Sequence, residues 1–317
     1  MITLIARRFA LALVTIFIIS FIVFFGVEAL PGDAATAYLG QFATPESLNA
    51  LREKFGLNAP PLVRYVNWLG DLVKGDLGDS LSRKESVAEL IGNRFRNTVV
   101  LSIAATLFAV PIAILLGVIA GLTRDKWPDI FISLVAIIGM TLPGFVNATV
   151  LVYFFAIKLN WFPAVTLIAS DAPVSKLLPN IVLPIITLTF IMVAHILRLV
   201  RTNMIDVMMS EYVQMARLKG VSAIRIVFSH ALPSAMLPTI NIVALTIGWL
   251  VGGVAIVEAV FNYPGIGTLM LRAISDKDFP LIQAIAIILS SIFIGINLVA
   301  DLLTLMLNPR LRTARGH

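Results

Sequence analysis

The sequence lacks the residues on which most catalytic and metal-binding chemistry depends. It has no cysteine and only three histidines, scattered at His195, His230 and His317. Disulfides and thiolate chemistry are therefore excluded, and no His spacing is typical of a metal site. No G-x-x-x-x-G-K-[ST] phosphate loop is present, so the chain is not a P-loop ATPase. We expect a protein that is not an enzyme and that binds no metal or cofactor itself.

Charge is also scarce. Charged residues are 13% of the 317 residues, against about 25% in soluble proteins. Hydrophobic residues reach 59%, and the mean hydropathy is +0.95. This composition cannot supply the polar surface of a soluble fold, so it indicates an integral membrane protein. The net charge of +6 does not indicate nucleic-acid binding, because the basic residues lie mostly at the ends of apolar blocks.

Six apolar stretches are long enough to cross a membrane, which takes about 20 helical residues. We predict spans at 9–30, 98–122, 130–157, 177–197, 237–259 and 280–307. The first stretch has no small-residue cleavage site after it, so we interpret it as a retained anchor. The predicted fold is all-α and polytopic. Its expected parts are an N-terminal end with the first span (1–30), an external helical domain (31–97), a transmembrane core (98–307) and a tail (308–317).

The distribution of Lys and Arg predicts the orientation. Twelve of these residues lie on the side of the two termini, and the two short loops on the opposite side hold four. Because basic residues concentrate in short cytoplasmic loops, we expect both termini to be cytoplasmic. The eight basic residues within 31–97 carry little weight, since long loops are translocated largely regardless of charge.

Proline and glycine mark irregular places in the spans. Three prolines inside spans predict kinks, which serve either packing or a pathway: Pro111, Pro143 and Pro184. Gly248-x-x-x-Gly252, beside Gly253, predicts a close helix contact, either within the chain or with a partner subunit.

The external segment reads as short helices. Thr44-Pro45 predicts a helix start, Gly56 its end, and Pro61 the start of a second helix. Ser86-x-x-Glu89 matches a capping box before the second span. This domain either contacts a delivering partner or shields the mouth of a pore.

The loop 198–236 between the fourth and fifth spans predicts a compact knob. Glu211–Leu218 reads as a helix, Gly220 as its left-handed stop, and Ser222 as the cap of a second helix. That second helix should cover 223–230 and end at Leu232-Pro233. Such a knob suits either docking to a soluble motor or adhesion to anionic lipid.

A family resemblance favours the first reading. The segment Gln214-Met215-Ala216-Arg217-Leu218-Lys219-Gly220, followed after nine residues by His230-Ala231-Leu232-Pro233, resembles the E-A-A-x-x-x-G-x9-I-x-L-P loop of ABC importer permeases. Gln214 stands in place of the motif's Glu and His230 in place of its Ile. Ala216, Gly220, Leu232 and Pro233 match.

The wider chain resembles the dipeptide/oligopeptide branch of these permeases, in the subunit type with an extended external domain. The matching stretches run in order along nearly the whole chain: Ala29-Leu30-Pro31-Gly32-Asp33, Leu51-Arg52-Glu53-Lys54-Phe55-Gly56-Leu57, Gly75-Asp76-Leu77-Gly78-Asp79-Ser80, Glu211–Gly220, Val257-Glu258-Ala259-Val260-Phe261, Pro264-Gly265-Ile266-Gly267 and Asn308-Pro309-Arg310-Leu311-Arg312.

The resemblance implies the type I ABC importer permease fold in a bacterial inner membrane. It also implies a second, homologous permease subunit, two cytoplasmic ATPase subunits that use ATP and Mg, and an external substrate-binding protein. The implied coupling residues are Gln214, Met215, Ala216, Arg217, Lys219, Gly220, Val221, Ser222, Leu232 and Pro233. The expected substrates are dipeptides or oligopeptides. The alternatives are nickel chelates, glutathione or opines.

Polar residues inside spans are candidates for a pathway, because they are unfavourable in lipid. They are Asn147, Asn241, Glu258, Asn297 and Asp301, and hydrogen bonding between helices is the competing interpretation. The Pro264-Gly265-Ile266-Gly267 segment predicts an external turn, structural or gating, followed by a short helix to Ile274. A secondary transporter is disfavoured because no clear repeat or buried charge pair appears, and a membrane enzyme because no catalytic grouping does.

Overall fold

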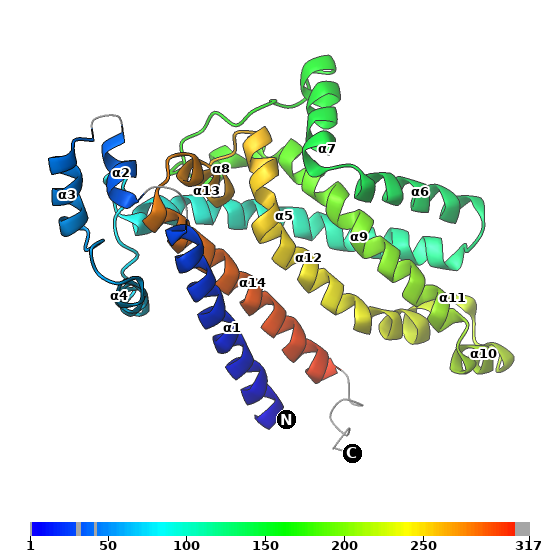
Figure 1. Ribbon diagram of the computed structural model, residues 1–317. Helices are drawn as coiled ribbons and strands as arrows, with labels where there is room; N and C mark the ends of the chain where they lie inside the picture. Colours follow the sequence, from blue (N-terminus) through cyan, green and yellow to red (C-terminus); the bar gives the residue numbers. More distant parts are fainter. Residues whose placement is uncertain (1, 30–32, 41–42, 308–317) are drawn as a thin grey trace.

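The computed structural model describes residues 2–29, 33–40 and 43–307 (Figure 1). Across these ranges the chain is helical, and the only extended pairing is an isolated bridge between Asp79 and Ser86. The tail 308–317 and the stretch Leu30-Pro31-Gly32 lie outside the described residues. The predicted all-α class is confirmed.

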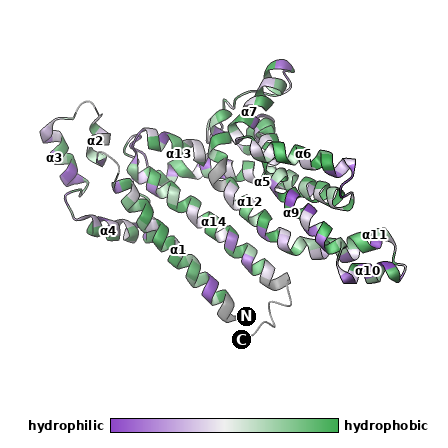
Figure 2. Cartoon of the chain, turned by 45° about the vertical axis from the view of Figure 1, so that its right-hand side comes forward, coloured by the Kyte–Doolittle hydropathy of each residue, from purple (hydrophilic) through white to green (hydrophobic). Residues whose placement is uncertain are grey.

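Five long helices have the length and apolar composition to cross a membrane. They are α1 (Ile2–Glu28), α5 (Val87–Leu122), α9 (Val182–Met208), α12 (Leu232–Val260) and α14 (Phe279–Leu307). Hydrophobic colour dominates α1, α5 and α6 in Figure 2, and hydrophilic residues gather on α3 and around α10 and α11. Many large apolar side chains of these helices are exposed, among them Phe9, Leu107 and Phe131, as a lipid environment requires.

The third predicted span, 130–157, is not one straight helix. It consists of α6 (Trp127–Thr141) and α7 (Gly144–Leu151), which continues as the π-helical turn η2 (Val152–Lys158), and the two parts are bent by 109°. Leu142 adopts an extended conformation because the ring of Pro143 disfavours a helical residue before it. The proline breaks this span, where the sequence predicted a kink.

The fourth span is displaced from its predicted position 177–197. The α8 helix (Val174–Leu177) and the 3-10 turn η3 (Leu178–Asn180) precede it, and α9 continues to Met208. Pro184 lies in the first turn of α9, where a missing N–H breaks no intrahelical bond, so the predicted kink there is wrong. Pro111 does lie inside α5.

Helices α5 and α9 form the centre of the core through a stripe of small residues. Ala105, Ala109, Ala113, Gly117 and Gly121 recur every four residues on α5, and the three alanines are fully buried. A Cβ added at Gly117 would lie 2.6 Å from Val200 Cβ, and one at Gly121 would lie 2.7 Å from Met204 Cβ. The backbones approach this closely only because these positions carry no side chain.

An ion pair fixes α6 against α9. The Arg201 guanidinium donates to both carboxylate oxygens of Asp129, at 2.5 and 2.7 Å, and Asp129 is buried. The backbone N–H of Asp125 donates to the same carboxylate at 2.9 Å. Such a bidentate pair has a defined geometry, so the connection between α5 and α6 is held onto α9.

The external segment contains the predicted helices. They are α2 (Ala34–Leu39), α3 (Pro45–Lys54) and α4 (Pro61–Lys74), and Thr44 forms a capping box with Ser47. Gly56 has a φ of +65°, as a glycine stop requires. Ser86 makes no side-chain cap, so the predicted capping box with Glu89 is wrong. The residues from 87 onward already belong to α5.

Two acidic residues anchor this segment. Partial burial raises the pKa of Asp33, but hydrogen bonds from Thr36 and the Arg52 guanidinium outweigh it and hold that pKa below its usual range. Asp278, buried between α13 (Ile266–Ser275) and α14, accepts hydrogen bonds from the side chains of Ser80 and Ser82. The loop before α5 is thereby tied to the N-terminal end of α14.

The contact between α5 and α9 can be tested with two glycines of the same helix. We expect Gly117→Ala to destabilise the protein by about 1–3 kcal/mol, because the new methyl group overlaps Val200. Gly92→Ala is the matched control, since a Cβ there meets nothing within 4 Å and alanine favours a helix. Thermal unfolding in detergent measures both. Equal melting temperatures for the two variants would contradict the packing.

Candidate functional site

The loop after α9 folds into the predicted knob, here residues 210–233. It contains α10 (Glu211–Leu218), α11 (Ala223–Arg225) and the π-helical turn η4 (Ile226–Ala231). Val213 of α10 and Ile226 and Val227 of η4 are buried. The knob is therefore folded, and Val227 joins it to the core that α5 and α9 form.

Gly220 ends α10 as predicted. Its φ is +74°, its N–H donates to the Arg217 carbonyl at 3.0 Å, and the Val221 N–H donates to the Ala216 carbonyl at 3.2 Å. These are the two hydrogen bonds of a Schellman motif. A Cβ at Gly220 would meet nothing within 4 Å, so the backbone conformation, and not lack of space, favours glycine here.

The second half of the knob differs from the prediction. The expected helix 223–230 does not end at Leu232-Pro233. Instead α11 and η4 lead without interruption into α12, and Pro233 lies in its first turn. The missing N–H of Pro233 removes one backbone donor from this continuous segment, directly after the π-helical turn η4. Ser222 occupies the cap position of α11 but makes no side-chain hydrogen bond. The knob is therefore continuous with a membrane-spanning helix.

The knob exposes several large apolar side chains among basic and polar ones. Leu218 and Ile224 are 82% and 74% exposed, and Phe228 of η4 is exposed as well. The other exposed coupling residues are Gln214, Met215, Arg217, Lys219 and Ser222, whereas Ala216, Val221 and Leu232 are partly buried. Exposed apolar side chains of this kind are typical of a protein-docking surface.

Gln214 has a structural contact of its own. Its side-chain amide donates to the Met209 carbonyl at 3.1 Å, where α9 ends. This bond satisfies a carbonyl that the helix end would otherwise leave open. The residue that replaces the acidic position of the resembled motif thus helps to fix α10 against α9.

The five polar candidates from the sequence do not converge on one site. Asn147 is buried and donates to the Leu142 carbonyl at 3.5 Å, at the break between α6 and α7. Asn241 accepts from Thr304 at 2.9 Å. Asn297 donates to the carbonyl one turn earlier on α14, and Asp301 forms an ion pair with Arg8 of α1. Asn297 and Asp301 line one groove between α1 and α14, whereas Asn147 and Asn241 bond elsewhere.

The fifth candidate, Glu258, belongs to a buried hydrogen-bonded cluster at the C-terminal end of α12. Its carboxylate accepts from Thr98 Oγ1 at 2.5 Å and from the Thr268 N–H at 3.0 Å. A Cβ at Gly265 would overlap this carboxylate, and one at Gly267 would overlap the backbone of α12. The two glycines are therefore required for the turn to close over Glu258.

Further hydrogen bonds hold the same turn. The Tyr263 hydroxyl donates to the Asn97 carbonyl at 2.8 Å, and the Asn97 amide donates to the Pro264 carbonyl at 3.0 Å. The Ile266 N–H donates to Thr98 Oγ1 at 2.8 Å. This bonding supports the structural reading of the turn over the gating one, and α13 follows it as the predicted short helix.

Helix α9 carries a polar stripe that was not predicted from the sequence. His195, Arg198, Thr202 and Asp206 follow one another at spacings of three and four residues, and all four are exposed. This spacing places them on one helix face. The His195 ring stacks beside Trp249 of α12, with centroids 6.5 Å apart. The polar spacing within an apolar span could have identified the stripe.

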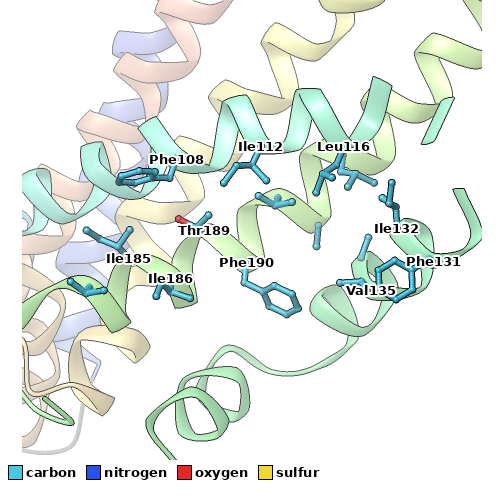
Figure 3. Close-up of a pocket in the computed structure, with 15 residues that line it drawn as sticks. Phe108, Ile112, Leu116, Phe131, Ile132, Val135, Ile185, Ile186, Thr189 and Phe190 are labelled. Atoms are coloured by element: carbon cyan, nitrogen blue, oxygen red, sulfur yellow. The ribbon is translucent and has the colours of Figure 1, made fainter. Parts of the chain in front are cut away.

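The opposite side of α9 is apolar. Between α5, α6 and α9 lies a groove of about 600 Å³, lined by side chains such as Phe108, Phe131 and Phe190 (Figure 3). The one oxygen among the side chains drawn belongs to Thr189, whose hydroxyl donates to the Ala105 carbonyl at 3.4 Å. This groove offers almost nothing for a polar solute to bind.

Comparison with known proteins identifies the family. Residues 113–313 match the binding-protein-dependent transport system inner membrane component, and residues 1–104 match the N-terminal region of such membrane components. The chain belongs to this family. The match over 113–313 includes the knob, α9 and α12, and the N-terminal match includes α1 to α4.

Similar proteins align over nearly their whole length. A probable peptide ABC transporter permease of Sinorhizobium fredii is 32% identical over 97% of this chain and 98% of its own. A putative peptide permease of Brucella ovis is 33% identical over 96% and 98%. A glutathione transport system permease of Escherichia coli is 35% identical over 94% and 95%. The protein is thus an inner-membrane permease subunit of the ABC importer type, which is the non-catalytic part of such a system.

The hydrogen-bonded cluster around Glu258 leads to a stability prediction for this permease. We expect Thr98→Val to destabilise the fold by about 1–3 kcal/mol, because it removes the partner of a buried carboxylate and of the Ile266 N–H. Thr106→Val is the control, since the Thr106 hydroxyl bonds only to the Ser102 carbonyl on its own helix. Thermal unfolding measures the stability of both variants. A loss of stability no greater for Thr98→Val than for Thr106→Val would refute the role of the cluster.

Proposed function

We propose that this chain is one of two permease subunits of an ATP-driven importer for dipeptides or oligopeptides. Its knob would dock into a cytoplasmic ATPase subunit, and an external binding protein would deliver the substrate. The observation that carries the proposal is that the knob is folded, exposes large apolar side chains and continues directly into α12. Closure of the ATPases would then move α9 and α12 through it.

Rigid connections support this role. Gln214 ties α10 to the end of α9, and the Asn203 amide of α9 donates to the Ala235 carbonyl at 3.3 Å and to Thr239 at 3.4 Å on α12. A displacement of the knob would therefore move both helices together. A loop lying on the lipid surface would need no such coupling, so these contacts favour docking over lipid adhesion.

The relatives support the substrate class. Two carry the word peptide in their names and one the word glutathione, at 32–35% identity. We infer that this chain passes short peptides, with glutathione as the second candidate. The second permease subunit would be a different, homologous chain, and both termini would face the cytoplasm together with the ATPases.

Gly220 provides the sharpest test of docking. We expect Gly220→Val to abolish co-purification of the ATPase subunit, because a β-branched residue strains the left-handed backbone and unfolds the end of α10. Gly220→Asn is the matched control and should retain most binding, since asparagine tolerates that conformation. Membrane insertion should stay intact in both. Full co-purification of the ATPase subunit with the valine variant would contradict the proposal.

The exposed apolar side chains of the knob can be tested separately. We expect Leu218→Asp to lower ATPase capture at least tenfold, because a charge enters a face that docking would desolvate. Leu167→Asp is the control, since Leu167 is equally exposed, at 82%, in the loop between η2 and α8. Equal capture by the two variants would show that the knob surface is not the docking site.

A further inference from the structure

The polar stripe of α9 lies in an unusual place for exposed polar groups. His195 is at the middle of α9 (Val182–Met208), about 20 Å of helix from its cytoplasmic end at 1.5 Å per residue. Arg198, Thr202 and Asp206 then lead toward that end on the same face. Polar and charged side chains at such depths are strongly unfavourable against lipid.

The outer faces of the neighbouring helices show what this protein presents to lipid. At similar depth, the exposed side chains outside the groove include Leu107 and Leu115 on α5 and Leu134 on α6. None of these is polar. At 100° per residue, the groove-lining residues of α9, such as Phe190 and Val193, lie roughly opposite His195 on the helix. The apolar and polar faces of α9 are thus separated, so the polar face meets a different environment.

Packing leaves this polar face available. His195 Nδ1 bonds to the Ile191 carbonyl and Thr202 to the Arg198 carbonyl, both within the helix. Within the described part of the chain the charged ends of Arg198 and Asp206 make no hydrogen bond or ion pair, in contrast to Arg201, which is held by Asp129. A cation exposed on this face has its donors free for an anion that arrives from outside the chain.

We propose that the stripe is a wall of the water-filled pathway and that Arg198 contacts the carboxylate of the transported substrate. The inference rests on the proposed function and deepens it. A guanidinium matches a carboxylate with two parallel hydrogen bonds, which is the group that a free peptide carries at its C-terminus. His195 and Trp249 form an aromatic platform one turn above it, against which an apolar side chain of the substrate packs.

Water exposure of the stripe is tested first, in the transporter assembled with its ATPases. Since the chain has no cysteine, single cysteines at His195 and Thr202 can be compared with single cysteines at Leu107 and Leu115. A charged, membrane-impermeant methanethiosulfonate should label the first pair in at least one nucleotide state, either with ATP or without it. The second pair should stay unlabelled in both states. Labelling of all four, or of neither pair in any nucleotide state, would overturn the pathway assignment.

Recognition of the carboxylate is tested by uptake of alanyl-alanine and its C-terminal amide into vesicles, at saturating binding protein. The measured quantity is the ratio of alanyl-alanine uptake to amide uptake. Arg198→Gln should lower this ratio at least tenfold, and Arg198→Lys should keep it close to the wild-type value. An equal loss for both probes would assign Arg198 to packing or to lipid headgroups and overturn the proposal. If the assembled wild-type protein shows no ATP-dependent uptake of either probe, while the cysteines label as expected, the proposed peptide substrate fails and the pathway wall stands.

Discussion

The close contact of α5 with α9 is the interaction on which the rest of the structure depends. It exists because alanine and glycine occupy every fourth position of α5, so that Val200 and Met204 reach its backbone. With one side of α9 fixed there, Arg201 can hold α6 through Asp129 on another. The face of α9 that carries the stripe stays exposed, and the knob follows the C-terminal end of this helix.

The helix ends opposite the knob are held by a different kind of bond. Along the spans the helices pack through small residues, because apolar side chains gain little by leaving lipid for protein. At the ends opposite the knob the contacts are polar and buried: Glu258 joins α5, α12 and α13, and Asp278 joins the loop before α5 to α14. The knob combines buried apolar side chains with exposed ones such as Leu218 and Ile224. Folding of the chain alone leaves these exposed side chains unburied.

Much of this architecture follows from the sequence, for physical reasons that differ among its parts. Apolar length predicts spans because lipid admits few other solutions, and Gly220 and Thr44 predict helix ends because their chemistry is local. The 109° bend at Pro143 could not be predicted, since a proline permits either a kink or a break and packing decides between them. The continuation of η4 into α12 could not be predicted from Pro233, because a proline that usually ends a helix here follows a π-helical turn through which the helix continues. The stripe was missed because polar residues were weighed singly and not by helix face, and His195 was set aside as isolated.

The proposed function requires that the knob be a cytoplasmic docking element. A single cysteine at Arg217, in the naturally cysteine-free chain, tests this most directly with a membrane-impermeant maleimide applied to right-side-out and inside-out vesicles. We predict labelling only in inside-out vesicles, and loss of that labelling when the ATPase subunits are co-expressed. A cysteine at Asn262, in the turn after α12, should show the reverse sidedness and no protection. Labelling at Arg217 from the outside, or labelling unchanged by the ATPase, would show that the knob is not a cytoplasmic docking element.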